Sequence, residues 1–300
     1  MITTRAFMDQ IWIDLNSPTR EEVDSLMLTY GIDPNITQDL LLPTPTQYSS
    51  DAGKNIYAVL HIPCFKHSSA ESFVQEIDFI ISKDSLITAR YDSIDALHFF
   101  AKQVEVSEIL NKGKKTHLFF GIMQEIYKSL TNELSYTEDW MEEIEKNIFE
   151  GREKTMVFTI SNVGRNLLNL KKIIEPHGHV FEFLRESGTE KFGPEFGEQT
   201  KTLQDNWRRI MRVVNNQIEL MIELRETNNS MLSTKQNEIM KQLTVIGSIL
   251  LPLTIVSQLF GMSISNFPLK NEPNAFWIIL GIMAIVILTT YAYSKFKKWM

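Results

Sequence analysis

Two long apolar runs, joined by a short polar link, close this sequence. The first extends from Leu243 to Phe260 and ends in Gly261-Met262-Ser263, and the second extends from Ala275 to Tyr293. Each run is near the ~20 residues that a helix needs to cross the hydrocarbon core of a bilayer. We therefore predict a membrane hairpin: a first span over 241–261, an external loop over 262–274, and a second span over 275–294.

Basic residues set the predicted orientation of this hairpin. Lys235 and Lys241 precede the first span, and a basic tail over 295–300 follows the second, whereas the link has only Lys270, offset by Glu272. Because basic residues stay on the cytoplasmic side, we expect both termini in the cytoplasm of a multi-pass protein of the cell (inner) membrane. No signal-peptide pattern is found at the N-terminus.

The composition of the chain limits the classes of function that it can have. With 37 acidic and 30 basic residues the net charge is −7, which argues against nucleic acid as a partner and leaves a cation possible. The single Cys64 excludes a disulfide framework and a cysteine-based zinc cluster. There is no phosphate-binding glycine loop and no nucleophile elbow, so we expect neither an enzyme nor a resident cofactor. His177 and His179 flank Gly178, where a surface turn is favoured over a metal site.

The chain before the hairpin predicts an α+β protein. Strand patterns at 11–15, 56–62, 76–81 and 86–89, the last two joined as a hairpin by a turn at Ser82–Ser85, indicate an α/β domain over 1–125. A helix start is predicted at Ser17-Pro18-Thr19, with a capping hydroxyl and the proline in the first turn. Helices follow over 126–240: an acidic one over 136–149, usually a solvated face, then one over 154–184 interrupted near Pro176. A loop is expected from Gly188 to Gly197.

A long stalk helix is predicted next, over 198–240. No Gly or Pro occurs from Glu198 until Gly247, so the helix should run directly into the first span. About sixty residues at ~1.5 Å per residue would extend roughly 90 Å. Such a helix needs packing partners along its length, either parallel copies in a symmetric oligomer or, for its upper part, an antiparallel helix of the same chain.

The first span carries one stripe at helical spacing that could line a pore. The stripe is apolar at its cytoplasmic end and becomes polar toward the external end, where an amide in lipid would be unfavourable. A glutamine bonded between helices remains the alternative. The stripe consists of Met240, Leu243, Gly247, Leu251, Thr254, Gln258 and Gly261.

The segment from Ile246 to Ser263, with its Leu-Pro-Leu-Thr core at 251–254 and its Gly261-Met262 turn, resembles the first membrane helix of the CorA family of divalent-cation channels. Nearly the whole chain follows the family order, including Trp12-Ile13-Asp14-Leu15, Glu76-Ile77-Asp78-Phe79 and the basic tail. The resemblance implies a funnel-shaped homopentamer in the lipid bilayer, with five first spans lining the pore.

One position departs from the family. Gly261 and Met262 match the Gly-Met-Asn motif at the pore mouth, but Ser263 replaces the asparagine whose ring binds a hydrated cation in the family. A hydroxyl is shorter than a carboxamide and has fewer hydrogen-bonding groups. Asn266 is the candidate that could compensate.

These observations leave three functional hypotheses. The first is a passive channel or transporter of divalent cations, with Mg²⁺ the first choice and Zn²⁺, Co²⁺ or Ni²⁺, as in the related ZntB branch, the alternative. The second is a non-conducting membrane-anchored scaffold or sensor that kept the fold. The third, a membrane-anchored enzyme, lacks any catalytic constellation.

Overall fold

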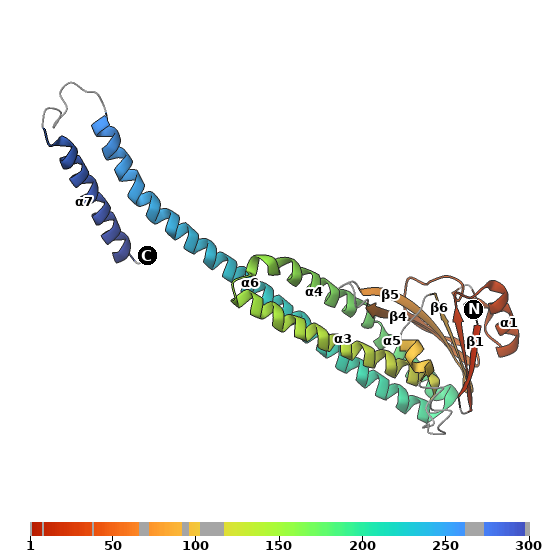
Figure 1. Cartoon of the computed structure of the whole chain (residues 1–300). Helices are drawn as coiled ribbons and strands as arrows, with labels where there is room; N and C mark the ends of the chain where they lie inside the picture. The colour runs from red at the N-terminus through yellow and green to blue at the C-terminus, as the bar shows by residue number, and fades with distance from the viewer. Residues whose placement is uncertain are drawn as a thin grey trace. The chain divides into compact units, whose positions relative to one another are not determined.

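A computed structural model describes residues 2–7, 9–37, 39–65, 72–91, 96–102, 117–261 and 273–297 (Figure 1). The chain divides into two compact units, residues 1–225 and 226–300, and each is described by itself.

The first unit is built on a six-stranded mixed sheet with the order β1-β2-β6-β5-β4-β3. Strands β2 and β6 pair in parallel, and every other neighbouring pair is antiparallel. The predicted strands and the hairpin of β5 and β6 are confirmed. The strand bounds are Ile2–Phe7 (β1), Gln10–Asn16 (β2), Tyr48–Ala52 (β3), Asn55–Phe65 (β4), Ser72–Ile81 (β5) and Ser85–Arg90 (β6).

Both faces of the sheet are covered, as Figure 1 shows, with α1 (Arg20–Tyr30) on one side and helices on the other. On the α1 side, η1 (Pro34–Ile36) and a segment over 39–47, here called the roof, close a core that contains Leu15, Val59 and Ile87. On the opposite side Phe79 meets Phe119 edge to face, with ring centroids 5.2 Å apart. Central strands buried on two faces read as nearly continuous apolar runs, as β4 does from Ile56 to Leu60.

Helix α1 begins two residues later than the sequence pattern suggested. Its N-cap is Thr19, whose hydroxyl accepts from the Glu22 N–H while the Glu22 carboxylate accepts from the Thr19 N–H, a capping box. Ser17 has a left-handed backbone (φ 49°) and donates its hydroxyl to the Tyr91 carbonyl instead. The predicted helix start is therefore confirmed, but the capping residue is Thr19 and Pro18 precedes the helix.

Helices fill the rest of the first unit. They are α3 (Leu118–Phe149), α4 (Glu153–Ile174), α5 (His177–Phe192) and the beginning of α6 (Pro194–Gly261), and residues 96–102 are also helical. The predicted break near Pro176 is confirmed. The loop predicted from Gly188 to Gly197 is wrong, because only Gly193, at φ 100°, separates α5 from α6. Gly188 and Gly197 are helical, and a Cβ at either would lie under 2.5 Å from Phe196 or Thr189, so glycine permits close helix packing there.

Helix α6 is one continuous helix of 68 residues. In the first unit its apolar stripe is buried against the same chain, at Leu203, Ile210, Val214, Met221 and Leu224, and Gln217 donates to the Leu134 carbonyl of α3 at 2.8 Å. The intrachain partner considered for the upper part of the stalk helix is therefore present. In the second unit, every residue from 233 to 244 is exposed in the single chain.

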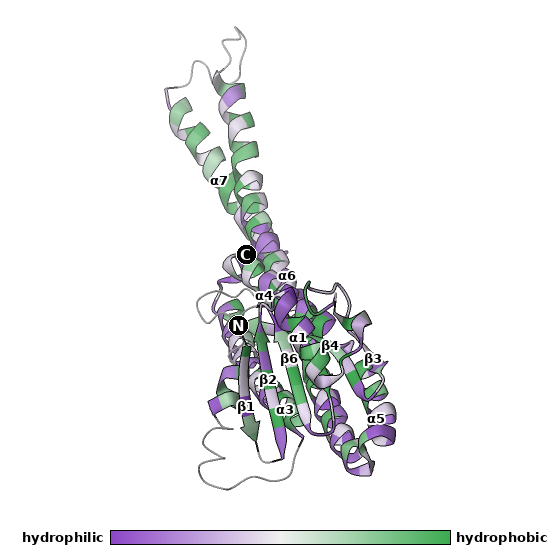
Figure 2. Cartoon of the chain, turned by 90° about the vertical axis from the view of Figure 1, so that its right-hand side faces the viewer, coloured by the Kyte–Doolittle hydropathy of each residue, from purple (hydrophilic) through white to green (hydrophobic). Residues whose placement is uncertain are grey.

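The second unit holds the end of α6 and helix α7 (Ala275–Phe296). Both are long and apolar enough to cross a membrane, and almost none of either apolar window is buried. Apolar residues dominate α7 and the part of α6 beside it (Figure 2).

Candidate functional site

The two sides of the membrane part of α6 differ in exposure. Helix α7 runs back beside the end of α6 in both views (Figures 1 and 2). One side of α6 is shielded: Val245 is only 6% exposed, and residues 249, 252, 253, 256 and 260 are half-buried. In a single chain, other parts of the same chain must provide this shielding, and α7 is the neighbour.

The stripe predicted from the sequence lies on the other side of the helix. At about 100° per residue, its positions centre roughly opposite the shielded side. Leu251 is 67% exposed, Leu243 61% and Met240 53%. Thr254 and Gln258 are exposed too, and Gly247 is half-buried, although a Cβ on it would meet nothing within 4 Å. The candidate residues therefore share one open face that α7 leaves uncovered.

This face changes character along its length. Met240, Leu243 and Leu251 make its N-terminal part apolar, and Thr254 and Gln258 supply the polar groups beyond. The Thr254 hydroxyl donates to the Leu250 carbonyl at 2.8 Å, so its oxygen can still accept from water on the open side. No charged residue occurs between Lys241 and Gly261.

Pro252 interrupts the hydrogen-bond ladder of the same helix. Proline has no N–H, so one carbonyl of the preceding turn loses its helical donor. Such positions are where membrane helices bend, provided that neighbouring groups compensate. Pro252 lies on the side of the helix that faces away from the stripe.

The pore-mouth candidates are only partly described. Gly261 is the last residue of α6. Met262, Ser263 and Asn266 lie outside the described residues, so their roles stay predictions.

The histidine pair does not form a site. His177 is fully buried at the start of α5, whereas His179 is exposed. The His177 Nε2 lies 2.9 Å from the His61 carbonyl, which can only accept, so Nε2 donates and Nδ1 accepts from the Tyr127 hydroxyl at 2.9 Å. Burial lowers the pKa of His177 to about 4. Within the described ranges no group of three metal-binding side chains occurs.

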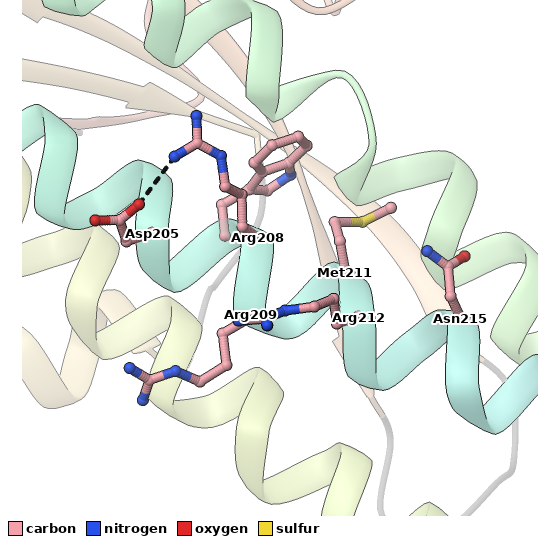
Figure 3. Close-up of a pocket in the computed structure, with 7 residues that line it drawn as sticks. Asp205, Arg208, Arg209, Met211, Arg212 and Asn215 are labelled. Atoms are coloured by element: carbon pink, nitrogen blue, oxygen red, sulfur yellow. Dashed lines mark hydrogen bonds and ion pairs between the residues drawn. The ribbon is translucent and has the colours of Figure 1, made fainter.

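The first unit has two charged surfaces of its own. The acidic residues of α3 between 138 and 145 are all exposed, as expected of a solvated face: Glu138, Asp139, Glu142, Glu143 and Glu145. An open pocket of about 600 Å³ on α6 has a basic lining instead (Figure 3). Arg208 pairs with Asp205 at 2.9 Å there, while Arg209 and Arg212 add two further positive charges, which do not suit a cation.

Comparisons with known proteins agree over nearly the whole chain. The family model described as "CorA-like Mg2+ transporter protein" matches residues 8–298. The cobalt/magnesium transport proteins CorA of Thermotoga maritima and Methanocaldococcus jannaschii are 22% and 23% identical. The matches cover 96% of this chain in both cases, and 83% and 91% of those proteins.

Solved structures show the same fold. The complete structure of the CorA magnesium transporter from M. jannaschii gives a TM-score of 0.83 at 21% identity, over 97% of this chain and 92% of that one. The full-length CmaX protein gives 0.76 at 16% identity, over 97% and 88%. A ZntB cytoplasmic domain from Vibrio parahaemolyticus gives 0.61 at 13% identity, over 74% and 87%.

Proposed function

The chain belongs to the CorA-like Mg²⁺ transporter protein family, and on that premise we propose that it forms a homopentameric membrane channel that passes divalent cations. Mg²⁺ is the proposed cargo, moving passively down its electrochemical gradient. For a divalent ion the membrane potential contributes about 4.6 kcal/mol per 100 mV, twice the single-charge value. Both termini are proposed to be cytoplasmic.

The observation that supports this proposal best is the open stripe on α6. Thr254 and Gln258 are exposed on the side that α7 leaves uncovered. In a bilayer this side must face lipid, another protein segment or water, and an amide in lipid is unfavourable. Five copies arranged around an axis would place the stripe on a shared water-filled path.

The path would be gated where it is apolar. Rings of Met240, Leu243 and Leu251 would form a narrow hydrophobic section that conducts only when wetted. Rings of Thr254 and Gln258 would hydrogen-bond to the waters of a hydrated ion, which suits Mg²⁺ because it releases its waters reluctantly. Gly261, Met262, Ser263 and Asn266 are the proposed mouth.

The serine at position 263 supports a second candidate for the transported ion. Zn²⁺, Co²⁺ or Ni²⁺ transport is the alternative, since a serine ring selects hydrated Mg²⁺ less well than an asparagine ring. A non-conducting scaffold or sensor is the remaining alternative. No catalytic function is proposed.

Flux of each of the four ions into proteoliposomes tests the proposal. We expect Mg²⁺ entry above empty vesicles. Entry of Zn²⁺, Co²⁺ or Ni²⁺ without Mg²⁺ would favour the alternative cargo, and no entry of any ion would leave only the non-conducting scaffold or sensor.

A further inference from the structure

Two carboxyl groups lie buried side by side on β5 in the first unit. Glu76 and Asp78 are two residues apart and so project from the same face of the strand. Glu76 is 8% exposed and Asp78 is fully buried. Asp78 pairs with Val59 of β4 and Ala89 of β6, which places it in the middle of the sheet, beneath the roof.

Glu76 has hydrogen-bond donors. The backbone N–H of Thr44, in the roof, donates to both of its carboxylate oxygens at 3.0 and 2.8 Å. The His61 Nε2 lies 3.3 Å from Oε2. Glu76 is therefore held as an acceptor, and it anchors the roof to β5.

Asp78 has none. Both of its carboxylate oxygens are buried without a hydrogen-bond partner, and so are the hydroxyls of Tyr57 and Thr44. Burial, with the neighbouring Glu76 carboxylate, raises the pKa of Asp78 well above its usual value. A buried ionised carboxylate without donors is very costly, whereas a protonated one can donate to an acceptor beside it.

The titratable groups around Asp78 are acids, phenols and one histidine. They are Glu76 on β5, Tyr57 and His61 on β4, Tyr48 on β3, Tyr91 after β6, and Asp39 in the roof. The hydroxyl of Tyr48 donates to Asp39 Oδ2 at 2.5 Å and that of Tyr91 donates to the Asp39 carbonyl at 3.0 Å, which fixes the roof at a second point.

We propose that Asp78 and Glu76 hold one proton between them, carried by Asp78 and donated to Glu76, and that loss of this proton to solvent releases the roof from the sheet. Ionised Asp78 would place a second negative charge beside Glu76, with only the nearby Tyr57 hydroxyl to oppose it. Water can reach that charge only if the roof, anchored at Thr44 and Asp39, moves away. The pair is then a proton-dependent latch on the α1 side of the sheet.

The full chain in detergent allows a direct test by infrared spectroscopy over a pH series. Wild type should show a carboxylic-acid carbonyl band at neutral pH that Asp78→Asn lacks. Asp14→Asn is the matched control: Asp14 is 6% exposed on β2 but accepts from Thr88 Oγ1 at 2.8 Å and pairs with Arg90 at 3.0 Å, so its removal should leave the band in place.

Hydrogen exchange of the backbone amides of residues 39–47, corrected for its intrinsic pH dependence, measures how readily the roof opens. In wild type, exchange should speed up by about tenfold or more as the carbonyl band disappears at high pH. In Asp78→Asn it should stay slow throughout, because the amide remains neutral.

Three results would overturn the proposal. One is a wild-type band that Asp78→Asn retains, and another is roof exchange that ignores the loss of the band. The third is loss of the band on adding Mg²⁺ or K⁺ at constant pH, which would make the pair a cation site. The wild-type titration alone decides if Asp78→Asn does not fold.

Discussion

At the scale of single residues, the proposed path depends on which hydroxyls face it. Thr254 on α6 and Thr289 on α7 have matching environments, because each hydroxyl donates to the carbonyl four residues earlier at 2.8 Å and each residue is exposed. Only Thr254 belongs to the stripe.

We predict that Thr254→Val lowers divalent-cation flux by about threefold or more, because an apolar ring resists wetting. Thr289→Val should leave flux unchanged. Flux into proteoliposomes at matched protein density measures both. An equal loss in the two variants would remove the argument for the stripe.

A separate prediction at the residue scale concerns ion selectivity at Ser263. Ser263→Asn adds a carboxamide with both an acceptor and donors for the shell of a hydrated ion. The ratio of Mg²⁺ to Ni²⁺ flux should rise by about threefold or more. An unchanged ratio would mean that residue 263 does not select, and flux that appears only in the variant would favour the non-conducting hypothesis.

The buried His177 lets us predict how acid changes the stability of the first unit. Its pKa is lowered from 6.5 to about 4, so the unfolded chain binds more protons than the folded one between these values. The stability it contributes is present above pH 6.5 and is lost as pH falls toward 4, a loss of about 3 kcal/mol. Thermal unfolding of wild type and His177→Gln should therefore converge as pH falls from 7 to 4.5, and parallel curves would contradict this assignment.

At the scale of elements, glycine packing between α5 and α6 is the feature most open to test. A Cβ on Gly188 would lie 2.3 Å from the Phe196 ring, whereas a Cβ on Gly164 of α4 would meet only the flexible end of Arg225, at 3.4 Å. Gly188→Ala should destabilise the protein by about 1–3 kcal/mol through overpacking. Gly164→Ala should stabilise it by about 0.5–1 kcal/mol, because alanine favours helix. Unfolding temperatures of the two variants that shift in the same direction would contradict the packing argument.

The same elements show how far the sequence alone could lead. The period-two run at 11–15 and the Ser82–Ser85 turn predicted β2 and the β5–β6 hairpin, since both are local signals. Edge strand β3 (Tyr-Ser-Ser-Asp-Ala) has no apolar alternation to reveal it. Gly188 and Gly197 look like loop residues unless the partner helix is known.

The candidate site could also be predicted only in part from the sequence. Helical spacing alone placed Thr254 and Gln258 on one face, and the structure adds that α7 leaves this face open. The sequence contains one sign of the buried pair: Asp78 is a carboxylate inside the apolar run from Ile77 to Ile81. Only the fold shows that this carboxylate is fully buried without a partner at hydrogen-bond distance.

At the scale of the whole molecule, the exposed part of α6 is where the proposed oligomer would add packing. Every residue from 233 to 244 is exposed in the single chain, including Ile239 at 62% and Leu243 at 61%, and a helix without packing partners is only marginally stable in water. Parallel copies would cover it. Native mass spectrometry in detergent should find five copies of the 34.7-kDa chain. A monomer would contradict the shared path, since one stripe cannot enclose water.

Voltage-driven Mg²⁺ entry into proteoliposomes tests the central claim most directly. Vesicles with equal Mg²⁺ and equal pH on both sides, and an inside-negative potential, leave the electrical force as the sole drive, about 4.6 kcal/mol per 100 mV for a divalent ion. A passive channel should load Mg²⁺ above its starting level, and Thr254→Val should load it more slowly. Vesicles that stay at the starting level with the pentamer intact would contradict passive Mg²⁺ conduction by this protein.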